Sequence, residues 1–279
     1  MANILFGANA VYPIGEYKQA MSFLYYDFIA YDFSLDHRPT LFLLVMIVFG
    51  VLFLFGEFGW FSGIVLYIMF TILRMRNPFI LDGSDNVIQV TFPFLIMADS
   101  YRYFATNYYK KIKIFNVIVS LVKPITTIVN PVATCAIIIQ ITFVYFFTAL
   151  AKLQGSLWLN GTAVFYTMRV AEFRATDWNI PLTRNYFFVV LATYFTLLWE
   201  LAFAFLIWFK KTKFWIIGLG FFFHVGIFIF MRIDNFSWIM IGSYALFIDD
   251  DEYRMIKEII EKLKDKLLFK WKNLRIVHI

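Results

Sequence analysis

The chain has 279 residues, of which 61% are hydrophobic and only 16% are charged. Soluble domains average about 45–50% apolar and about 25% charged residues, so this composition excludes an ordinary soluble protein. The net charge of +6 does not indicate nucleic-acid binding, because the basic residues gather in short loops and at the C-terminus, as cytoplasmic loops of membrane proteins do. A single cysteine, Cys135, excludes a disulfide within the chain. We therefore expect an all-α, polytopic integral membrane protein.

The N-terminal part leads into three predicted spans. Residues 1–39 mix aromatic and charged side chains, and their apolar piece, Met21–Tyr31, is shorter than the roughly 20 residues that a span needs. We expect this piece to be a helix that is either interfacial or packed against the bundle, within an N-terminal interfacial segment. The first three spans are then Thr40–Phe55, Ser62–Leu73 and a polar-interrupted one from Val87 to about Phe104.

Residues 114–129 leave two alternatives open. They are apolar but interrupted by Lys123 and Pro124, so they are either a half-span or an amphipathic helix on the membrane surface. Asn130 and Pro131 are expected to begin the fourth span, which ends at Lys152. Whether residues 114–129 cross the membrane does not follow from the sequence.

The remaining apolar runs complete a set of about seven spans. After a polar-rich connection over 153–184, they are Tyr186–Phe209, Phe214–Met231 and Phe236–Ile248. Residues 40–249 thus form one membrane domain. Residues 250–279 start acidic and end basic, with apolar residues near helical spacing, which predicts an amphipathic helix on the anionic cytoplasmic leaflet.

The basic clusters predict how the chain sits in the cell membrane. Lys110–Lys113, Lys210–Lys213 and the C-terminal helix all lie on one side if residues 114–129 do not cross. Positive loops favour the cytoplasmic side. The C-terminus is then cytoplasmic, and the 153–184 connection faces outward.

Lys152 is the most informative single residue, because it stands at the end of the apolar run 136–151. One interpretation is a lysine that snorkels to the headgroups, next to the interfacial Trp158. The other is a lysine inside the helix bundle, where loss of solvent favours the neutral amine, a usable base.

Two further polar residues lie within predicted spans. Glu200 is in the middle of the apolar segment 197–203 and can hardly snorkel, so it is expected to be protonated or paired. His224 follows three phenylalanines, where a satisfied core histidine is the commoner outcome unless Lys152 or Glu200 is close. The three histidines of the chain lie in three separate regions, so we expect no metal site.

The range Gln140–Gly161 (QITFVYFFTALAKLQGSLWLNG) resembles the lysine-centred signature of the HTTM family, the membrane domain shared with vitamin K-dependent γ-carboxylases. Weaker agreement comes from Arg76-Asn-Pro followed by Asp82–Asp85, from Trp199-Glu200, and from Phe223-His224 ahead of Arg232–Ser237. Together these segments look most like the bacterial sporulation-delaying-protein B type.

The resemblance implies a function in maturing a secreted antimicrobial peptide. Lys152 matches the carboxylase lysine that deprotonates the reduced vitamin, so it is the expected base, with His224 and Glu200 tuning or positioning it. The implied cofactor is a reduced quinone of the menaquinol or vitamin K hydroquinone type. The implied partners are the lipid membrane, the peptide substrate and a co-encoded protein.

Six other residues are candidates for substrate binding. Trp158, Asn160 and Tyr166 are expected to line the mouth of the site. Asp85, Arg232 and Asp234 are further candidates, with a turn, stop or helix-cap role as the alternative for each.

Two rival functions make different predictions. A non-catalytic chaperone, export or immunity protein that binds the peptide needs only a charge, so Lys152→Arg keeps its activity, whereas an enzyme loses it because arginine does not release its proton. A purely structural membrane subunit predicts that Lys152, Glu200 and His224 lie far apart, without a shared cavity.

Overall fold

The computed structural model describes residues 6, 16–19, 33, 37–78, 81–98, 113–171 and 173–276, with side chains from 127 to 266 in the second half of the chain. Every regular element in these ranges is a helix. The elements are α3 (Arg38–Leu54), α4 (Trp60–Arg76), α5 (Gly83–Met97), α6 (Lys113–Leu153), α7 (Ser156–Leu159), α8 (Ala163–Thr167), α9 (Asn179–Arg184), α10 (Tyr186–Leu206), α11 (Lys210–Met231), α12 (Asp234–Ser243), the 3₁₀ helix η4 (Tyr244–Phe247) and α13 (Asp250–Ile276).

Three of the described helices are long and apolar enough to cross a membrane. They are Thr127–Leu153 within α6, α10 and α11, with 27, 21 and 22 residues. This confirms an all-helical membrane-type architecture in the described residues. Helix α3 is also apolar but has 17 residues, just below the usual span length.

The predicted span Phe236–Ile248 is divided in the structure. Helix α12 has ten residues, which is about 15 Å of helix and half of a bilayer core. The chain then tightens into the 3₁₀ turn η4 before α13 begins. An apolar run alone does not reveal this change from α-helix to 3₁₀ helix, because both bury the same residue types.

Helix α6 corrects the prediction that Asn130 and Pro131 begin a new span. It runs unbroken for 41 residues from Lys113 to Leu153 and contains both Pro124 and Pro131. Each proline removes one N–H donor from the helix, but neighbouring turns keep it intact, as in many membrane helices. At about 62 Å, α6 is twice as long as the hydrocarbon core is thick.

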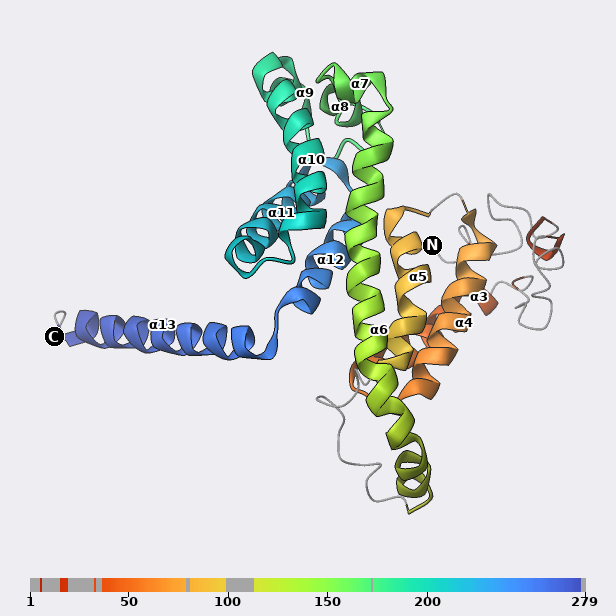
Figure 1. The fold of residues 1–279 in the computed structure, drawn as a ribbon. Coiled ribbons are helices and arrows are strands. Elements are labelled where there is room, and N and C mark those ends of the chain that lie inside the picture. Colours follow the sequence, from red (N-terminus) through yellow and green to blue (C-terminus); the bar gives the residue numbers. More distant parts are fainter. Residues whose placement is uncertain are drawn as a thin grey trace.

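Helix α6 is also the centre of the bundle (Figure 1). It packs against α5 on one side and α10 on the other. Beyond α5 follow α4 and α3, and beyond α10 follow α11 and α12. The short helices α7 to α9 gather at the C-terminal end of α6, and α13 projects away from the bundle (Figure 1).

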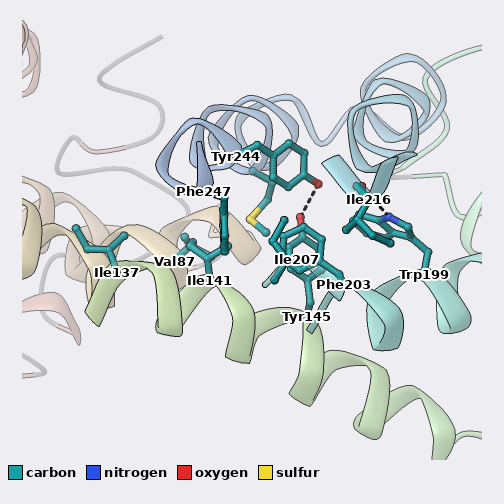
Figure 2. Packing of buried hydrophobic residues seen from close by; sticks show 11 residues of the cluster. Val87, Ile137, Ile141, Tyr145, Trp199, Phe203, Ile207, Ile216, Tyr244 and Phe247 are labelled. Atoms are coloured by element: carbon teal, nitrogen blue, oxygen red, sulfur yellow. Dashed lines mark hydrogen bonds between the residues drawn. The ribbon is translucent and has the colours of Figure 1, made fainter. Parts of the chain in front are cut away.

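The largest buried cluster lies where α6, α10, α11 and α12 meet (Figure 2). Its aromatic centre is Tyr145, Trp199 and Phe203, whose rings contact one another in edge-on or tilted geometry. Trp199 Nε1 donates to the carbonyl of Ile216 over 3.2 Å, which fixes α10 against α11.

Helix α5 starts earlier than the predicted span at Val87 because of its cap. The side chain of Asp82 accepts from the backbone N–H of Ser84, and that of Asp85 accepts from the N–H of Asp82. This reciprocal arrangement is a capping box, which draws Gly83 into the first turn. Helix α5 ends at Met97, and residues 99–112 lie outside the described residues, as does Met21–Tyr31.

Helix α13 occurs where the amphipathic C-terminal helix is predicted, and it also begins with a capping box. The N–H of Glu252 donates to Asp249, and the N–H of Asp249 donates to the Glu252 carboxylate. The same carboxylate pairs with Lys213 in the first turn of α11. The basic cluster Lys210–Lys213 therefore lies in a helix and not in the loop that was predicted.

Candidate functional site

A cavity of about 960 Å³ lies between α5, α6, α8, α10 and α11. Its walls are mostly aromatic and aliphatic, with few polar groups. The polar groups include Lys152, Glu200, His224 and Gln140. An apolar cavity of this size with a few convergent polar groups is the usual form of a small-molecule site.

Lys152 and Glu200 form an ion pair across the cavity wall. The ammonium of Lys152, near the end of α6, donates to Oε1 of Glu200, in the middle of α10. The Lys152 side chain is 23% exposed and that of Glu200 is 7% exposed. Lys152 is therefore paired with a buried carboxylate of α10 and is mostly covered by the bundle.

Trp158 completes the surroundings of the ion pair. The Lys152 nitrogen lies 5.0 Å from the centre of its ring, a cation–π distance. Trp158 belongs to the short helix α7 and lines the cavity. The turn after α6 thus folds back so that an aromatic ring covers the charged pair.

His224 lies deeper, fully buried on α11. Its Nε2 is 2.9 Å from the hydroxyl of Tyr145, which is in turn 2.7 Å from the hydroxyl of Tyr244. Figure 2 shows this contact between the two tyrosines at the centre of the aromatic cluster. Three helical elements, α6, α11 and η4, thus contribute to one chain of hydrogen bonds.

Two buried polar atoms of the site have no hydrogen-bond partner among the described residues. They are Oε2 of Glu200 and Nδ1 of His224, and both residues line the cavity. Buried polar groups in folded proteins are nearly always paired, so each such atom needs an explanation. One explanation is a ligand that binds in the cavity and supplies the missing hydrogen-bond partners.

The other predicted binding residues are placed elsewhere and do not line the cavity. Asn160 ends α7, and Tyr166 is half-exposed on α8. Asp85 belongs to the cap of α5, Asp234 to the first turn of α12, and Arg232 ends α11 with a left-handed backbone at φ 52°. The positions of Asp85, Asp234 and Arg232 thus match the structural role, a turn, helix cap or stop, that the sequence offered as the alternative to substrate binding.

Tyr145 and Tyr244 are site residues that the sequence reasoning did not single out. Both are almost fully buried, and Tyr145 lines the cavity. A buried tyrosine usually finds a partner for its hydroxyl, so two tyrosines in apolar runs were the available signal. Among the described residues, no group of three or more His, Cys, Asp or Glu side chains is placed to hold a metal ion.

Comparison of this chain with protein-family models, with curated proteins and with solved structures finds no match. The likeness to the HTTM family therefore rests on the sequence motifs alone.

Proposed function

We propose that this chain is a multi-pass protein of the cell membrane that matures a secreted peptide by lysine-dependent proton transfer in its cavity. The observation that carries the proposal is the ion pair of Lys152 and Glu200, lodged in a mostly apolar cavity together with His224. A charged pair in such surroundings adds little to stability, because the loss of solvation offsets much of the attraction between the charges. Stability alone therefore does not explain its presence. Intramembrane ionisable residues generally mark functional sites.

The pair can act as a proton acceptor. As a unit it is neutral: Lys152 passes its proton to Glu200, and the free amine takes one proton from an acidic X–H group of a ligand, which leaves the pair singly positive. The X–H bond breaks, the electron pair stays on X, and the resulting anion is stabilised by the adjacent ammonium. A poorly solvated site strengthens that attraction.

A reduced quinone fits the groups that line the cavity. The unpaired Oε2 of Glu200 can accept from a hydroxyl, and the aromatic and aliphatic walls suit a ring and an apolar tail. Lys152, Glu200 and His224 would hold the polar end. When bound, such a quinol supplies an acidic hydroxyl and reducing equivalents.

Four further features belong to the proposal. Helices α3, α4, α5 and α12 would complete the bundle to about seven membrane segments. Lys213 and Glu252 join the starts of α11 and α13, so the basic first turn of α11 and the start of the C-terminal helix lie on the same side, which the positive-inside rule predicts to be cytoplasmic. The cavity, next to α7 and α8, would then open outward. The HTTM-like motif supplies the peptide-maturation role and its bacterial, sporulation-delaying-protein B type.

Mass spectrometry of the peptides secreted by cells that carry the wild type or Lys152→Ala tests the proposal. A mass change or cleavage seen only with the wild type would support it and identify the reaction. Identical masses with equal secretion would overturn it. Exposed Lys257→Ala in α13 is a matched control for loss of one lysine and should leave the peptide masses unchanged.

The alternative function is a membrane chaperone, exporter component or immunity protein that binds the peptide without changing it. The observation that favours it is the same ion pair, because a lysine held by a carboxylate also serves as a fixed charge for binding. Lys152→Arg separates the two: binding retains its activity, and proton transfer loses it. The structural-subunit alternative predicted no shared cavity, whereas Lys152, Glu200 and His224 line the same one, which favours the proposal.

A further inference from the structure

His224 has two ring nitrogens in different surroundings. Nε2 contacts the Tyr145 hydroxyl at 2.9 Å, whereas Nδ1 has no partner among the described residues. The ring is fully buried and lies against the rings of Trp199, Phe223 and Phe236. Burial among apolar rings disfavours a charge, so the imidazole is neutral and carries one N–H.

The two tyrosines decide which nitrogen carries that hydrogen. In one arrangement, Tyr244 donates to Tyr145, and Tyr145 donates to Nε2, so that the hydrogen is on Nδ1 and both hydroxyls are used. In the other, Nε2–H donates to Tyr145 and Tyr145 donates to Tyr244. In this second arrangement the hydroxyl hydrogen of Tyr244 has no acceptor among the described contacts. The unprotonated Nδ1 of His224 then has no donor.

The first arrangement leaves one unpaired group and the second leaves two. Unmade hydrogen bonds of buried groups are costly, so the first is favoured. The unpaired group in it is an Nδ1–H, a donor on a residue that lines the cavity. The unpaired Oε2 of Glu200 is its counterpart, an acceptor.

We propose that Tyr145 is the positioning residue that holds His224 as the Nδ1–H tautomer, so that it donates to an oxygen atom of the cavity ligand. This inference rests on the proposed function in that it takes the cavity as the site of the ligand. A quinol or quinone ring and a peptide backbone each carry such an oxygen. The donor edge of His224 would also stabilise negative charge that develops on this oxygen after the Lys152–Glu200 pair takes a proton.

Nitrogen-15 NMR of the full chain in detergent micelles tests the tautomer directly. The variant His37→Gln/His278→Gln leaves His224 as its one histidine, so labelled histidine reports that ring alone. We expect a protonated Nδ1 and an unprotonated Nε2. An Nε2–H tautomer, or a doubly protonated ring, would overturn the proposal without any mutation in the site.

Conservative variants test the role of each hydroxyl. Tyr145→Phe removes the donor to Nε2, so the two tautomers should then mix. Tyr244→Phe leaves Tyr145 with no other acceptor than Nε2, so the Nδ1–H form should persist. Tyr194→Phe is the matched control, because that hydroxyl donates to the Leu159 carbonyl outside this chain of hydrogen bonds. If His224 remains entirely in the Nδ1–H form in the Tyr145→Phe variant, the positioning role of Tyr145 is contradicted.

Titration with two probes tests the ligand. Menadione offers quinone carbonyls without a peptide, and a short apolar peptide amide offers backbone carbonyls without a quinone. A shift of the His224 Nδ1 resonance with either probe identifies the source of the oxygen, and no shift with both at saturation would contradict the ligand contact. A wrong tautomer with Lys152-dependent peptide modification overturns this inference alone, whereas a correct tautomer without modification overturns the proposed function alone.

Discussion

Lys213 Nζ lies 2.7 Å from Oε2 of Glu252, and this pair joins the first turn of α11 to the first turn of α13. Both side chains are only 10% exposed, so the pair is buried. Glu252 Oε2 also accepts from the backbone of Asp249, which makes one carboxylate serve the helix cap and the ion pair together. The attachment of the projecting α13 thus depends on a few polar contacts.

Lys213→Met should release the start of α13. Removal of one partner leaves the Glu252 carboxylate buried and unpaired, which costs about 3–5 kcal/mol. Hydrogen exchange of residues 250–256 should then rise in detergent micelles. Arg254→Met is the control, because its pair with Asp251 is exposed, spans 3.6 Å and contributes little. Equal exchange in both variants would show that the buried pair does not hold the helix.

The start of α13 should also loosen in acid. The backbone N–H of Glu252 lowers the pKa of the Asp249 carboxyl, with smaller help from Lys213 and Lys210. A lowered folded-state pKa adds stability above the unfolded value of about 3.9, and this contribution is lost as the pH falls through the folded value.

We expect the hydrogen-exchange protection of the first turn of α13, corrected for intrinsic rates, to decrease as the pH falls below about 4. Asp249→Asn should flatten this dependence, whereas Asp251→Asn, with a side chain 90% exposed, should leave it in place. If the two variants respond alike, the Asp249 cap is not the cause.

Gly220→Ala should destabilise the aromatic cluster. A Cβ at this position would lie 2.4 Å from the Tyr244 hydroxyl and 2.6 Å from Trp199. Overpacking of this kind costs about 1–3 kcal/mol, and the midpoint of thermal unfolding in detergent should fall. Gly218→Ala, two residues away with nothing within 4 Å, should be neutral or stabilising by up to about 1 kcal/mol. A higher midpoint for Gly220→Ala would contradict the packing described above.

Glu200→Gln should abolish peptide modification while the fold persists. The amide still accepts from Lys152 but cannot take up a proton, and loss of general acid–base catalysis typically lowers rates about 10²- to 10⁴-fold. The rate is measured as the modified fraction of peptide against time, with equal thermal midpoints as evidence of folding. Glu258→Gln, exposed on α13, is the matched control. Unchanged modification by Glu200→Gln would remove Glu200 from the chemistry.

The sequence predicted those parts of the fold in which one physical signal dominates. Helices α10 and α11 follow the long apolar runs closely, because membrane helices need uninterrupted apolar length. The continuity of α6 was missed because Pro124 and Pro131 read as stops, although packing against neighbouring helices sustains a helix that contains proline. The shortness of α12 was missed because η4 has the same composition as a span.

For the candidate site, the useful signal in the sequence was the free-energy cost of placing a charged or polar side chain in an apolar segment. Lys152, Glu200 and His224 stand out because charged or polar groups in apolar runs are expensive, and the structure lines one cavity with them. Their chemical roles stay predictions. Tyr145 and Tyr244 carry no such signal, since tyrosine also belongs at interfaces and in aromatic cores, and only the fold shows that their hydroxyls meet.

The uninterrupted course of α6 has a mechanical consequence. Lys152 near one end and Lys113 at the other are about 60 Å apart along a single rod, at 1.5 Å of rise per residue. A tilt of this rod shifts both ends in opposite directions about the point where the bilayer holds it. A molecule that binds α6 near Lys113 can therefore shift the Lys152 amine by tilting the whole helix, to the extent that the helix does not bend at Pro124 or Pro131.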